Sequence, residues 1–163
     1  MSKNYYSLGL MSGTSMDGVD ASIIYSDGTS KYKAISNKYF VYNKDFYQDL
    51  TSLRDKINSS KDLKRLSNDL KSIEKEITLF HAKVVNELIR ESNVDIDFIG
   101  FHGQTIFHNA DEKISRQLGD GKLLSQLTKK TVVYDFRQND LKNGGQGAPL
   151  APVFHQLIVK QNK

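Results

Sequence analysis

The sequence has 163 residues but contains no cysteine, no tryptophan and only 2 prolines. The lack of cysteine excludes disulfide bonds and metal sites built on thiolates. No stretch approaches the roughly 18 consecutive apolar residues that a membrane-spanning helix needs, so we expect no membrane partner. Residues 1–4 are not followed by the apolar core of a signal peptide. A cytoplasmic location agrees with these observations and is our expectation.

Neither the basic nor the acidic residues are concentrated in one part of the chain. There are 23 basic and 19 acidic residues, a formal net charge of +4, and the lysines are scattered along the sequence. Because a nucleic-acid-binding protein needs a concentrated basic face, we expect no nucleic-acid partner. Apolar residues make up 38% and charged residues 26% of the chain, which is typical of a globular protein. The length suffices for one domain with its own core.

The first 42 residues predict a β-meander. Residues 5–11, 19–25 and 31–42 are rich in β-branched and aromatic side chains, which favour strands. The turn residues Ser26 to Thr29 separate the second run from the third. We therefore expect these runs to form consecutive antiparallel strands.

The loop between the first two strands predicts a phosphate site. Gly13 and Gly18 are expected to adopt backbone angles that residues with a Cβ avoid, so that consecutive N–H groups face one concavity. Thr14 and Ser15 add hydroxyl donors, and no Gly-Lys-Ser/Thr sequence of a Walker loop follows. Asp17 and Asp20 have carboxylates suited to a hydrated magnesium ion. The alternative is an ordinary hairpin with a long turn, because turns favour the same residue types.

Residues 44–56 predict a helix with Asn43 as its N-cap, and a longer helix is expected to begin near Ser60 or Asp62. Apolar residues repeat along the longer helix at steps of three and four residues. The repeating positions are Leu63, Leu66, Leu70, Ile73, Ile77, Phe80, Val84 and Leu88. Packing of this stripe against the sheet is one interpretation, and a coiled-coil seam in a homodimer is the other. His81 lies on the same helix, and we assign it no role.

A short buried strand is expected at residues 98–101, directly before a polar motif. The motif consists of His102, Gly103, Gln104 and Thr105. Polar side chains at the carboxyl end of a buried strand are well placed to bind a ligand in an open α/β sheet. The alternative is a strand-end turn with a satisfied histidine.

The rest of the chain predicts further α/β structure and a glycine-rich segment. Strands are expected at residues 114–118 and 131–134, with helices at residues 122–128 and from residue 153 onward. Gly144, Gly145 and Gly147 let the backbone approach a ligand closely. Arg137 is the local candidate for an anionic group. With no repeats or linkers in the sequence, we expect one domain over residues 1–163.

Four segments together resemble one family. The wording Gly-Leu-Met-Ser-Gly-Thr-Ser-Met-Asp-Gly-Val-Asp, from residue 9 to residue 20, is similar to the N-terminal signature of the anhydro-N-acetylmuramic acid kinases. The segments 100–105, 119–120 and 135–152 match the family in the same order. The family belongs to the sugar kinase, Hsp70 and actin superfamily. The resemblance therefore implies a mixed α/β sheet of the ribonuclease H-like, actin-like ATPase type, opening with the meander and phosphate hairpin and flanked by helices.

The resemblance also implies an activity and binding residues. Such kinases use ATP and Mg²⁺ to hydrolyse the 1,6-anhydro ring of anhydro-N-acetylmuramic acid and to phosphorylate the freed 6-oxygen, in peptidoglycan recycling. The residues implied to bind ATP are Ser12, Gly13, Thr14, Ser15, Met16, Asp17, Gly18 and Val19. The residues implied to bind the amino sugar are His102, Gly103, Gln104, Thr105, Arg137, Gly145, Gln146 and Gly147.

The family's base aspartate belongs to an Asp-x-Gly-Pro-Gly-Asn segment that this sequence does not contain. Asp140 is the local substitute candidate for that base. Asn139 stands where the family often has arginine, which affects the expected sugar contacts. We therefore expect an N-terminal kinase lobe that is inactive without a C-terminal lobe, as a fragment or a split product. The alternative is a non-catalytic phosphate- or sugar-binding module.

Overall fold

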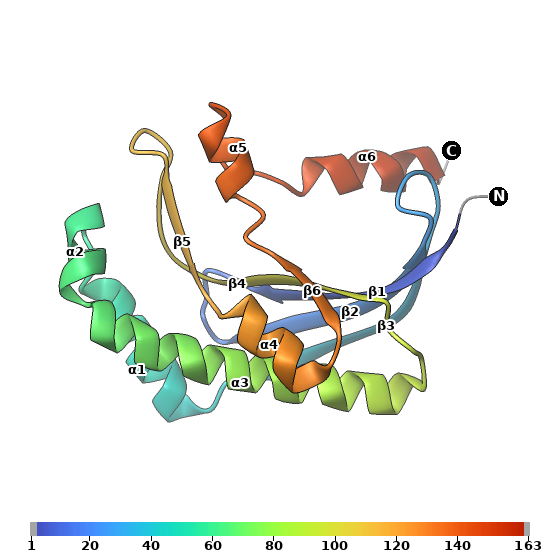
Figure 1. Ribbon diagram of the computed structural model, residues 1–163, viewed down its shortest axis with the longest axis horizontal. Helices are drawn as coiled ribbons and strands as arrows, with labels where there is room; N and C mark the ends of the chain where they lie inside the picture. The colour runs from blue at the N-terminus through green and yellow to red at the C-terminus, as the bar shows by residue number, and fades with distance from the viewer. Residues whose placement is uncertain (1–2, 162–163) are drawn as a thin grey trace.

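The computed structural model describes residues 3–161 of the chain, as one mixed sheet with helices on both faces (Figure 1). The strand order is β3-β2-β1-β4-β5, and β6 pairs with β4 beside β5. This arrangement confirms the expected α/β class and agrees with an actin-like, ribonuclease H-like ATPase lobe. The expected single lobe of residues 1–163 includes residues 1–2 and 162–163, which lie outside the described residues.

The N-terminal meander is confirmed. Strands β1 (Tyr5–Ser12), β2 (Gly18–Ser26) and β3 (Tyr32–Val41) pair antiparallel in sequence order. Alternate residues of β1 and β2, such as Leu8 and Ile23, point into the core, as the two-residue period of a half-buried strand requires.

Strand β4 (Phe98–Asn109) is much longer than the expected strand at residues 98–101. Its first half pairs parallel with β1 on one side and with β6 (Thr131–Tyr134) on the other. Its second half pairs antiparallel with β5 (Ile114–Leu118). The polar motif at residues 102–105 therefore lies inside a strand, where the β4 partner changes from β6 to β5, and not after the strand's end. The expectation of a short strand was wrong because the hairpin with β5 extends the pairing past the motif.

The expected longer helix is divided in two. α1 (Lys44–Asp55) begins at Asn43, whose side chain accepts a hydrogen bond from the Phe46 N–H. α2 (Ser60–Arg65) and α3 (Ser67–Ser92) are separated at Leu66, whose φ and ψ of −98° and 20° are not helical. Ser59 and Asp62 form a capping box that starts the short α2.

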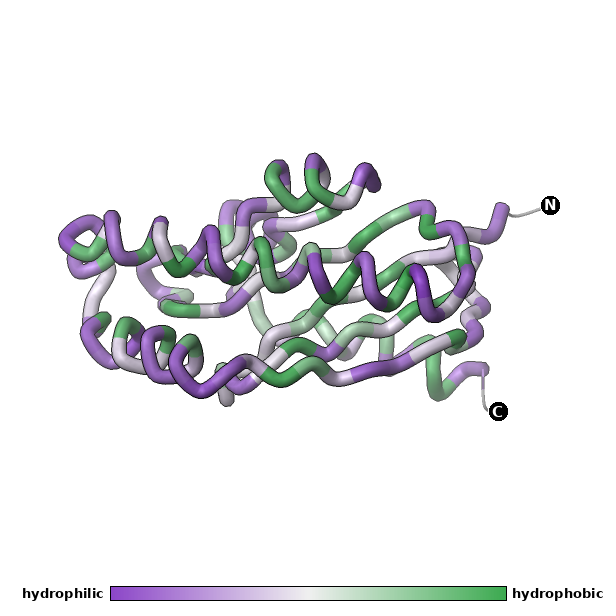
Figure 2. Tube along the Cα trace, turned by 90° about the horizontal axis from the view of Figure 1, so that it is seen from below, coloured by the Kyte–Doolittle hydropathy of each residue, from purple (hydrophilic) through white to green (hydrophobic). Residues whose placement is uncertain are grey.

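The apolar stripe of α3 packs inside the chain. Figure 2 shows hydrophobic and hydrophilic residues alternating along the helices on this side of the sheet. The buried stripe residues on this helix are Leu70, Ile73, Ile77, Val84 and Leu88. They belong to the same core cluster as Leu8 and Ile99 of the sheet. The core interpretation of the stripe is therefore confirmed for these residues.

The remaining helices lie on both faces of the sheet. α4 (Gly121–Thr128) lies beside α3, and its N-cap Asp120 accepts from the Lys122 and Leu123 N–H groups. α5 (Gln138–Lys142) was not expected from the sequence, whereas α6 (Pro152–Gln161) was. Figure 1 shows α6 on the face of the sheet opposite α3. None of the helices among residues 3–161 combines the length and apolar character needed to cross a membrane.

Candidate functional site

The loop between β1 and β2 is a tight turn with donors at its tip. The Met16 N–H donates to the Gly13 carbonyl at 3.1 Å. Within the described part of the chain, the N–H groups of Thr14 and Ser15 donate to no protein acceptor, and both residues are exposed. Two neighbouring free N–H groups beside two hydroxyls are an arrangement suited to an anion.

The two glycines of this loop do not have the backbone angles that we expected of them. Neither Gly13 nor Gly18 has a positive φ, whereas Met16 has φ of 60° and a buried side chain. The expectation of special backbone angles at the two glycines was therefore wrong, because the buried Met16 side chain holds the left-handed position instead. Gly18 is needed for space, since a Cβ there would overlap the Phe40 carbonyl and lie 2.7 Å from the Tyr39 hydroxyl.

Ser12 stabilises the base of the loop. Its side chain is buried, and its hydroxyl donates to the Gly18 carbonyl at 2.9 Å and lies 2.7 Å from the Tyr42 hydroxyl. Burial raises the pKa of Tyr42 to about 12, so this hydroxyl stays protonated at neutral pH. In this structure the Ser12 side chain faces the protein interior, and Thr14 and Ser15 carry the exposed hydroxyls of the loop.

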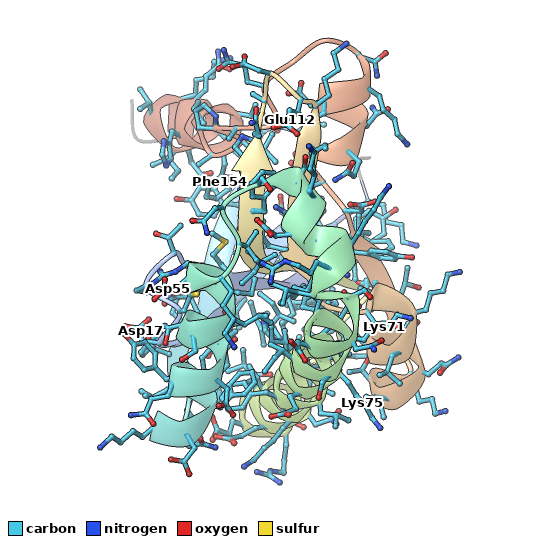
Figure 3. All side chains as sticks on the ribbon, turned by 90° about the vertical axis from the view of Figure 1, so that its left-hand side faces the viewer. Asp17, Asp55, Lys71, Lys75, Glu112 and Phe154 are labelled. Carbon is cyan, nitrogen blue, oxygen red and sulfur yellow. The ribbon has the colours of Figure 1, made fainter. Side chains whose placement is uncertain are left out.

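Two carboxylates flank the turn. Asp17 lies at the edge of the molecule in Figure 3 and accepts a hydrogen bond from the Ser15 hydroxyl at 2.5 Å. Hydrogen bonds from Ser15 and then Tyr39 hold the pKa of Asp17 below its usual value, so it is ionised at neutral pH. Asp20 lies on β2, paired with Tyr39 of β3. Among the described residues, no group of three or more His, Cys, Asp or Glu side chains is arranged to hold a metal ion.

Gln104 connects the loop between β1 and β2 to β4. Its side chain is fully buried, and its Nε2 donates to the Gly13 carbonyl at 2.9 Å. The two residues are 91 positions apart in the chain. Their contact brings the loop at residues 12–19 directly against the polar motif of β4. Thr105, the next residue, is half-buried and accepts from Gln117 Nε2 through its hydroxyl at 3.1 Å.

His102 and Arg137 connect β4 to the glycine-rich segment. Arg137 donates to His102 Nε2, and its Nη1 donates to the Gly147 carbonyl at 2.6 Å. His102 Nδ1 lies 2.7 Å from the carbonyl of Gly103 and must therefore carry the ring hydrogen. Burial and then the charge of Arg137 lower the pKa of His102, which keeps the ring neutral.

The glycine-rich segment is folded around Asp140. The Asp140 carboxylate accepts from the Gly147 N–H at 2.7 Å, and its backbone carbonyl accepts from the Gly145 N–H at 2.8 Å. A Cβ on Gly145 would overlap the Asp140 carboxylate. Gln146 is exposed between these two glycines. The Asp140 side chain is thus engaged with the backbone of the loop in this structure.

The structure brings the expected segments to one edge of the sheet. The carboxyl ends of β1, β4 and β6 point the same way because β4 is parallel to both neighbours, and such an edge is where open α/β sheets bind ligands. Sequence reasoning missed Tyr39 and Tyr42, which contact Asp17 and Ser12. Their positions follow only from the β2–β3 register, in which Asp20 pairs with Tyr39.

The fold is that of an actin-like, ribonuclease H-like ATPase lobe, and the candidate site lies beside the hairpin loop between its first two strands. The family model described as anhydro-N-acetylmuramic acid kinase matches residues 5–163. The chain therefore belongs to the anhydro-N-acetylmuramic acid kinase family, which confirms the resemblance seen in the sequence.

Individual relatives agree. An anhydro-N-acetylmuramic acid kinase of Pelagibacter ubique strain HTCC1062 is 64% identical over 163 residues, covering 100% of this chain and 44% of the relative. The kinase of the same description from Agrobacterium fabrum is 40% identical over 154 residues, 93% of this chain and 41% of the relative. One from Brucella canis is 39% identical over 155 residues, 93% of this chain and 42% of the relative. The chain thus spans less than half the length of these curated relatives.

Proposed function

We propose that this chain supplies the phosphate-binding and sugar-binding lobe of an ATP-dependent kinase for anhydro-N-acetylmuramic acid. In the reaction, a base takes a proton from a water molecule, the water oxygen bonds to the anomeric carbon, and the bond from that carbon to the 6-oxygen breaks. The freed 6-oxygen takes the γ-phosphoryl group of ATP, and ADP leaves. The product is N-acetylmuramic acid 6-phosphate, an intermediate of peptidoglycan recycling. Because ATP is a cytoplasmic substrate, we place the reaction in the cytoplasm.

The observation that carries the proposal is the pair of contacts joining the family's motifs into one site. Gln104 contacts the phosphate loop through Gly13, and Arg137 joins His102 to Gly147. Segments that are distant in the sequence are thereby held together at the carboxyl edge of the sheet. A phosphate group and a sugar bound at this edge would be neighbours, as phosphoryl transfer requires.

The phosphate loop has donors suited to ATP. We assign the free N–H groups of Thr14 and Ser15, with the Thr14 hydroxyl, to the transferred and neighbouring phosphates, since the Ser15 hydroxyl donates to Asp17. Magnesium supplies positive charge against the phosphates when it is bound. Since Mg²⁺ keeps several waters and needs only one or two protein carboxylates beside the phosphates, Asp17 and Asp20 fit it through water.

The sugar side has polar groups and a guanidinium. We assign the amino sugar to the region around His102, Thr105 and Gln146, with the charge of Arg137 near the lactyl carboxylate. The neutral His102 ring uses Nδ1–H for the Gly103 carbonyl and Nε2 for Arg137. In this site His102 therefore orients Arg137 and does not act as a proton carrier.

We assign the catalytic base and the adenosine site to the part of the longer relatives that this chain does not match. The carboxylate of Asp140 is occupied by the Gly147 N–H, which makes it a poor base. We favour a C-terminal kinase lobe over a second copy of this chain as the partner. The apolar stripe of α3, which a coiled-coil dimer would use, is already buried within the chain.

The test is a chimera in which residues 1–163 are joined to the unmatched remainder of the Pelagibacter ubique relative. We expect the chimera to form the 6-phosphate sugar from anhydro-N-acetylmuramic acid and ATP, and the 163-residue chain to form none. The chain alone should gain activity when that remainder is added as a separate protein. An active 163-residue chain would contradict the assignment of the base to another lobe.

The rival function is a non-catalytic phosphate- or sugar-binding module. The local candidate for the base, Asp140, has its carboxylate engaged by the Gly147 N–H, which favours this alternative. Sugar or ATP binding by the chain, together with a chimera that folds but has no kinase activity, would support the module and contradict the kinase lobe.

A further inference from the structure

The Gln104 side chain has no access to a ligand in this structure. It is fully buried, and its Nε2 donates to the Gly13 carbonyl at 2.9 Å and more distantly, at 3.4 Å, to the Thr105 carbonyl. A contact with the sugar through this side chain, as the family resemblance implies, does not agree with that burial. Its strongest contact is instead with the backbone of the phosphate loop.

The contact fixes the orientation of one peptide group. The Gly13 carbonyl accepts from both the Met16 N–H and Gln104 Nε2, which occupies both of its lone pairs. The peptide bond that follows Gly13 is trans, so the Thr14 N–H points away from the carbonyl. A carbonyl held toward the interior thus directs the adjacent N–H outward. A peptide turned the other way would present a partly negative oxygen to the phosphates.

Gly13 gives this peptide little restraint of its own. A Cβ at Gly13 would meet only the Ser15 hydroxyl, at 3.5 Å, so the surrounding atoms do not fix the peptide sterically. Glycine also has the widest backbone freedom of all residues. The hydrogen bond from Gln104 is therefore the restraint on the Gly13 carbonyl that comes from outside the loop.

The oxygen atom of the Gln104 amide also indicates that the residue acts through its Nε2 donor. Gln104 Oε1 is buried and has no hydrogen-bond partner among the described residues. An apolar residue of similar size would avoid this unsatisfied acceptor, which is unfavourable in a protein interior. The amide cannot be turned over, because Oε1 would then face the Gly13 carbonyl. The glutamine is thus explained by its donor and not by packing.

We propose that Gln104 is a positioning residue that orients the Gly13 peptide, so that the Thr14 N–H group faces the phosphates of ATP. The inference rests on the proposed phosphate role of the loop. Because β4 also carries His102, the same contact links the phosphate loop to the strand that bears the sugar side of the site.

The first test compares Gln104→Met with its parent, both in the chimera described above, which holds the adenosine site. Methionine has a similar length but no donor. The matched control is Gln138→Met, which removes an amide-to-carbonyl bond from Gln138 to Ser115, outside the loop. We expect Gln104→Met to weaken binding of MgATP at least about tenfold in titration calorimetry and to speed amide hydrogen exchange at Met16 without nucleotide. The control should leave both within about twofold.

The second variant is Gln104→Glu, which remains informative if the methionine variant does not fold. Ionised glutamate presents an acceptor to the Gly13 carbonyl, whereas protonated glutamic acid presents a donor. Burial raises the pKa of such a carboxyl group. We expect MgATP affinity of this variant, relative to the parent, to improve as the pH is lowered from 7.5 to 5.5. A residue that only fills space would not show this recovery.

The possible results separate this inference from the proposed function. ATP binding by the parent chimera that neither variant weakens overturns the positioning role and leaves the phosphate loop in place. Faster exchange at Met16 in Gln104→Met, with no ATP binding by a folded parent chimera, supports the contact but overturns the phosphate role. Weaker binding and faster exchange together, with the control unchanged, support the proposal.

Discussion

Arg137 donates to the Nε2 atom of His102 through both Nη2, at 2.8 Å, and Nε, at 3.2 Å. A protonated imidazole has no lone pair to accept these bonds, so the pair requires a neutral ring. The contact also joins α5 and the glycine-rich segment to the middle of β4. The charge state of His102 and the position of Arg137 are therefore linked.

Removing the guanidinium should raise the pKa of His102. Burial is the larger cause of its lowered pKa, and the charge of Arg137 is a second one. We expect Arg137→Ala to move the His102 titration upward in an NMR pH series, whereas Lys142→Ala, an exposed cation on α5, should not. An unchanged His102 titration in Arg137→Ala would show that the two side chains do not interact in solution.

His81 should make the fold sensitive to acid. The ring is buried, its Nδ1 bonds to the Ile77 carbonyl, and its Nε2 has no partner among the described residues. Burial lowers its pKa to about 4, from an ordinary value of 6.5. The unfolded chain therefore takes up this proton first, and the free energy of unfolding falls as the pH drops from about 6.5 to about 4.

The size of the loss in the free energy of unfolding follows from the shift of the His81 pKa. A shift of about 2.5 pKa units corresponds to about 3 kcal/mol at the low-pH end of that window. Denaturant unfolding between pH 7.5 and 4 should show a flatter pH dependence in His81→Gln than in the parent. His155→Gln, on the exposed α6, is the control and should keep the parent's slope. An identical slope in parent and His81→Gln would contradict the assignment.

The two glycines of the phosphate loop should respond differently to substitution. A methyl group at Gly18 would overlap the Phe40 carbonyl, and we expect Gly18→Ala to destabilise the fold by about 1–3 kcal/mol. Gly13 has open space around it, so Gly13→Ala should change the melting temperature little. Gly13→Val should reduce ATP affinity by crowding the phosphates. Equal melting temperatures for the two alanine variants would show that the Gly18 contact with β3 is not maintained in solution.

Asp140 should prove to be a structural residue. Asparagine keeps an oxygen that can accept from the Gly147 N–H, whereas alanine does not. In the chimeric kinase we expect Asp140→Asn to retain activity within about tenfold and Asp140→Ala to raise the sugar KM. Loss of a catalytic base typically lowers kcat by about 10²–10⁴. A loss of that size in Asp140→Asn, with the fold intact, would identify Asp140 as the base.

Substituting an exposed residue on the sugar side of the site should change the KM for the sugar or kcat, but not the affinity for ATP. Gln146→Ala is expected to raise the sugar KM or lower kcat of the chimera several-fold, because it removes a polar side chain without disturbing the Asp140 turn. The affinity for ATP should stay the same. The reverse pattern, with weaker ATP binding and unchanged sugar parameters, would mean that the two sides of the site are exchanged.

The sequence predicts most of the elements because their signals are local. Asn43, the turn at residues 26–29 and the α3 stripe act through neighbours a few residues away, and each element was found where its pattern indicated. The split at Leu66 was missed because the apolar spacing runs through it without interruption. The length of β4 was missed because it depends on pairing with β5, a partner that no local pattern reveals.

The site was predictable as a set of residues but not as a set of roles. Ser12 and Gln104 were expected among the ligand-binding residues, yet their side chains are buried and bond to the protein. The left-handed residue of the loop is Met16 and not a glycine, since a buried side chain can hold an unfavourable φ that sequence statistics assign to glycine. Such contacts join residues far apart in the chain and need the tertiary structure.

The position of β4 between β1 on one side and β5 and β6 on the other also has a consequence for how the chain folds. Strands β1, β2 and β3 are neighbours in sequence, so their pairing closes short loops. The pairing of Leu8 with Ile99 closes a loop that contains both other strands and three helices. Because closing a long loop costs more entropy and contacts between distant residues form slowly, the meander should gain amide protection first in pulse-labelled hydrogen exchange. The phosphate loop would then remain mobile until β4 inserts and Gln104 reaches Gly13, so the ability to bind nucleotide should arise late in folding.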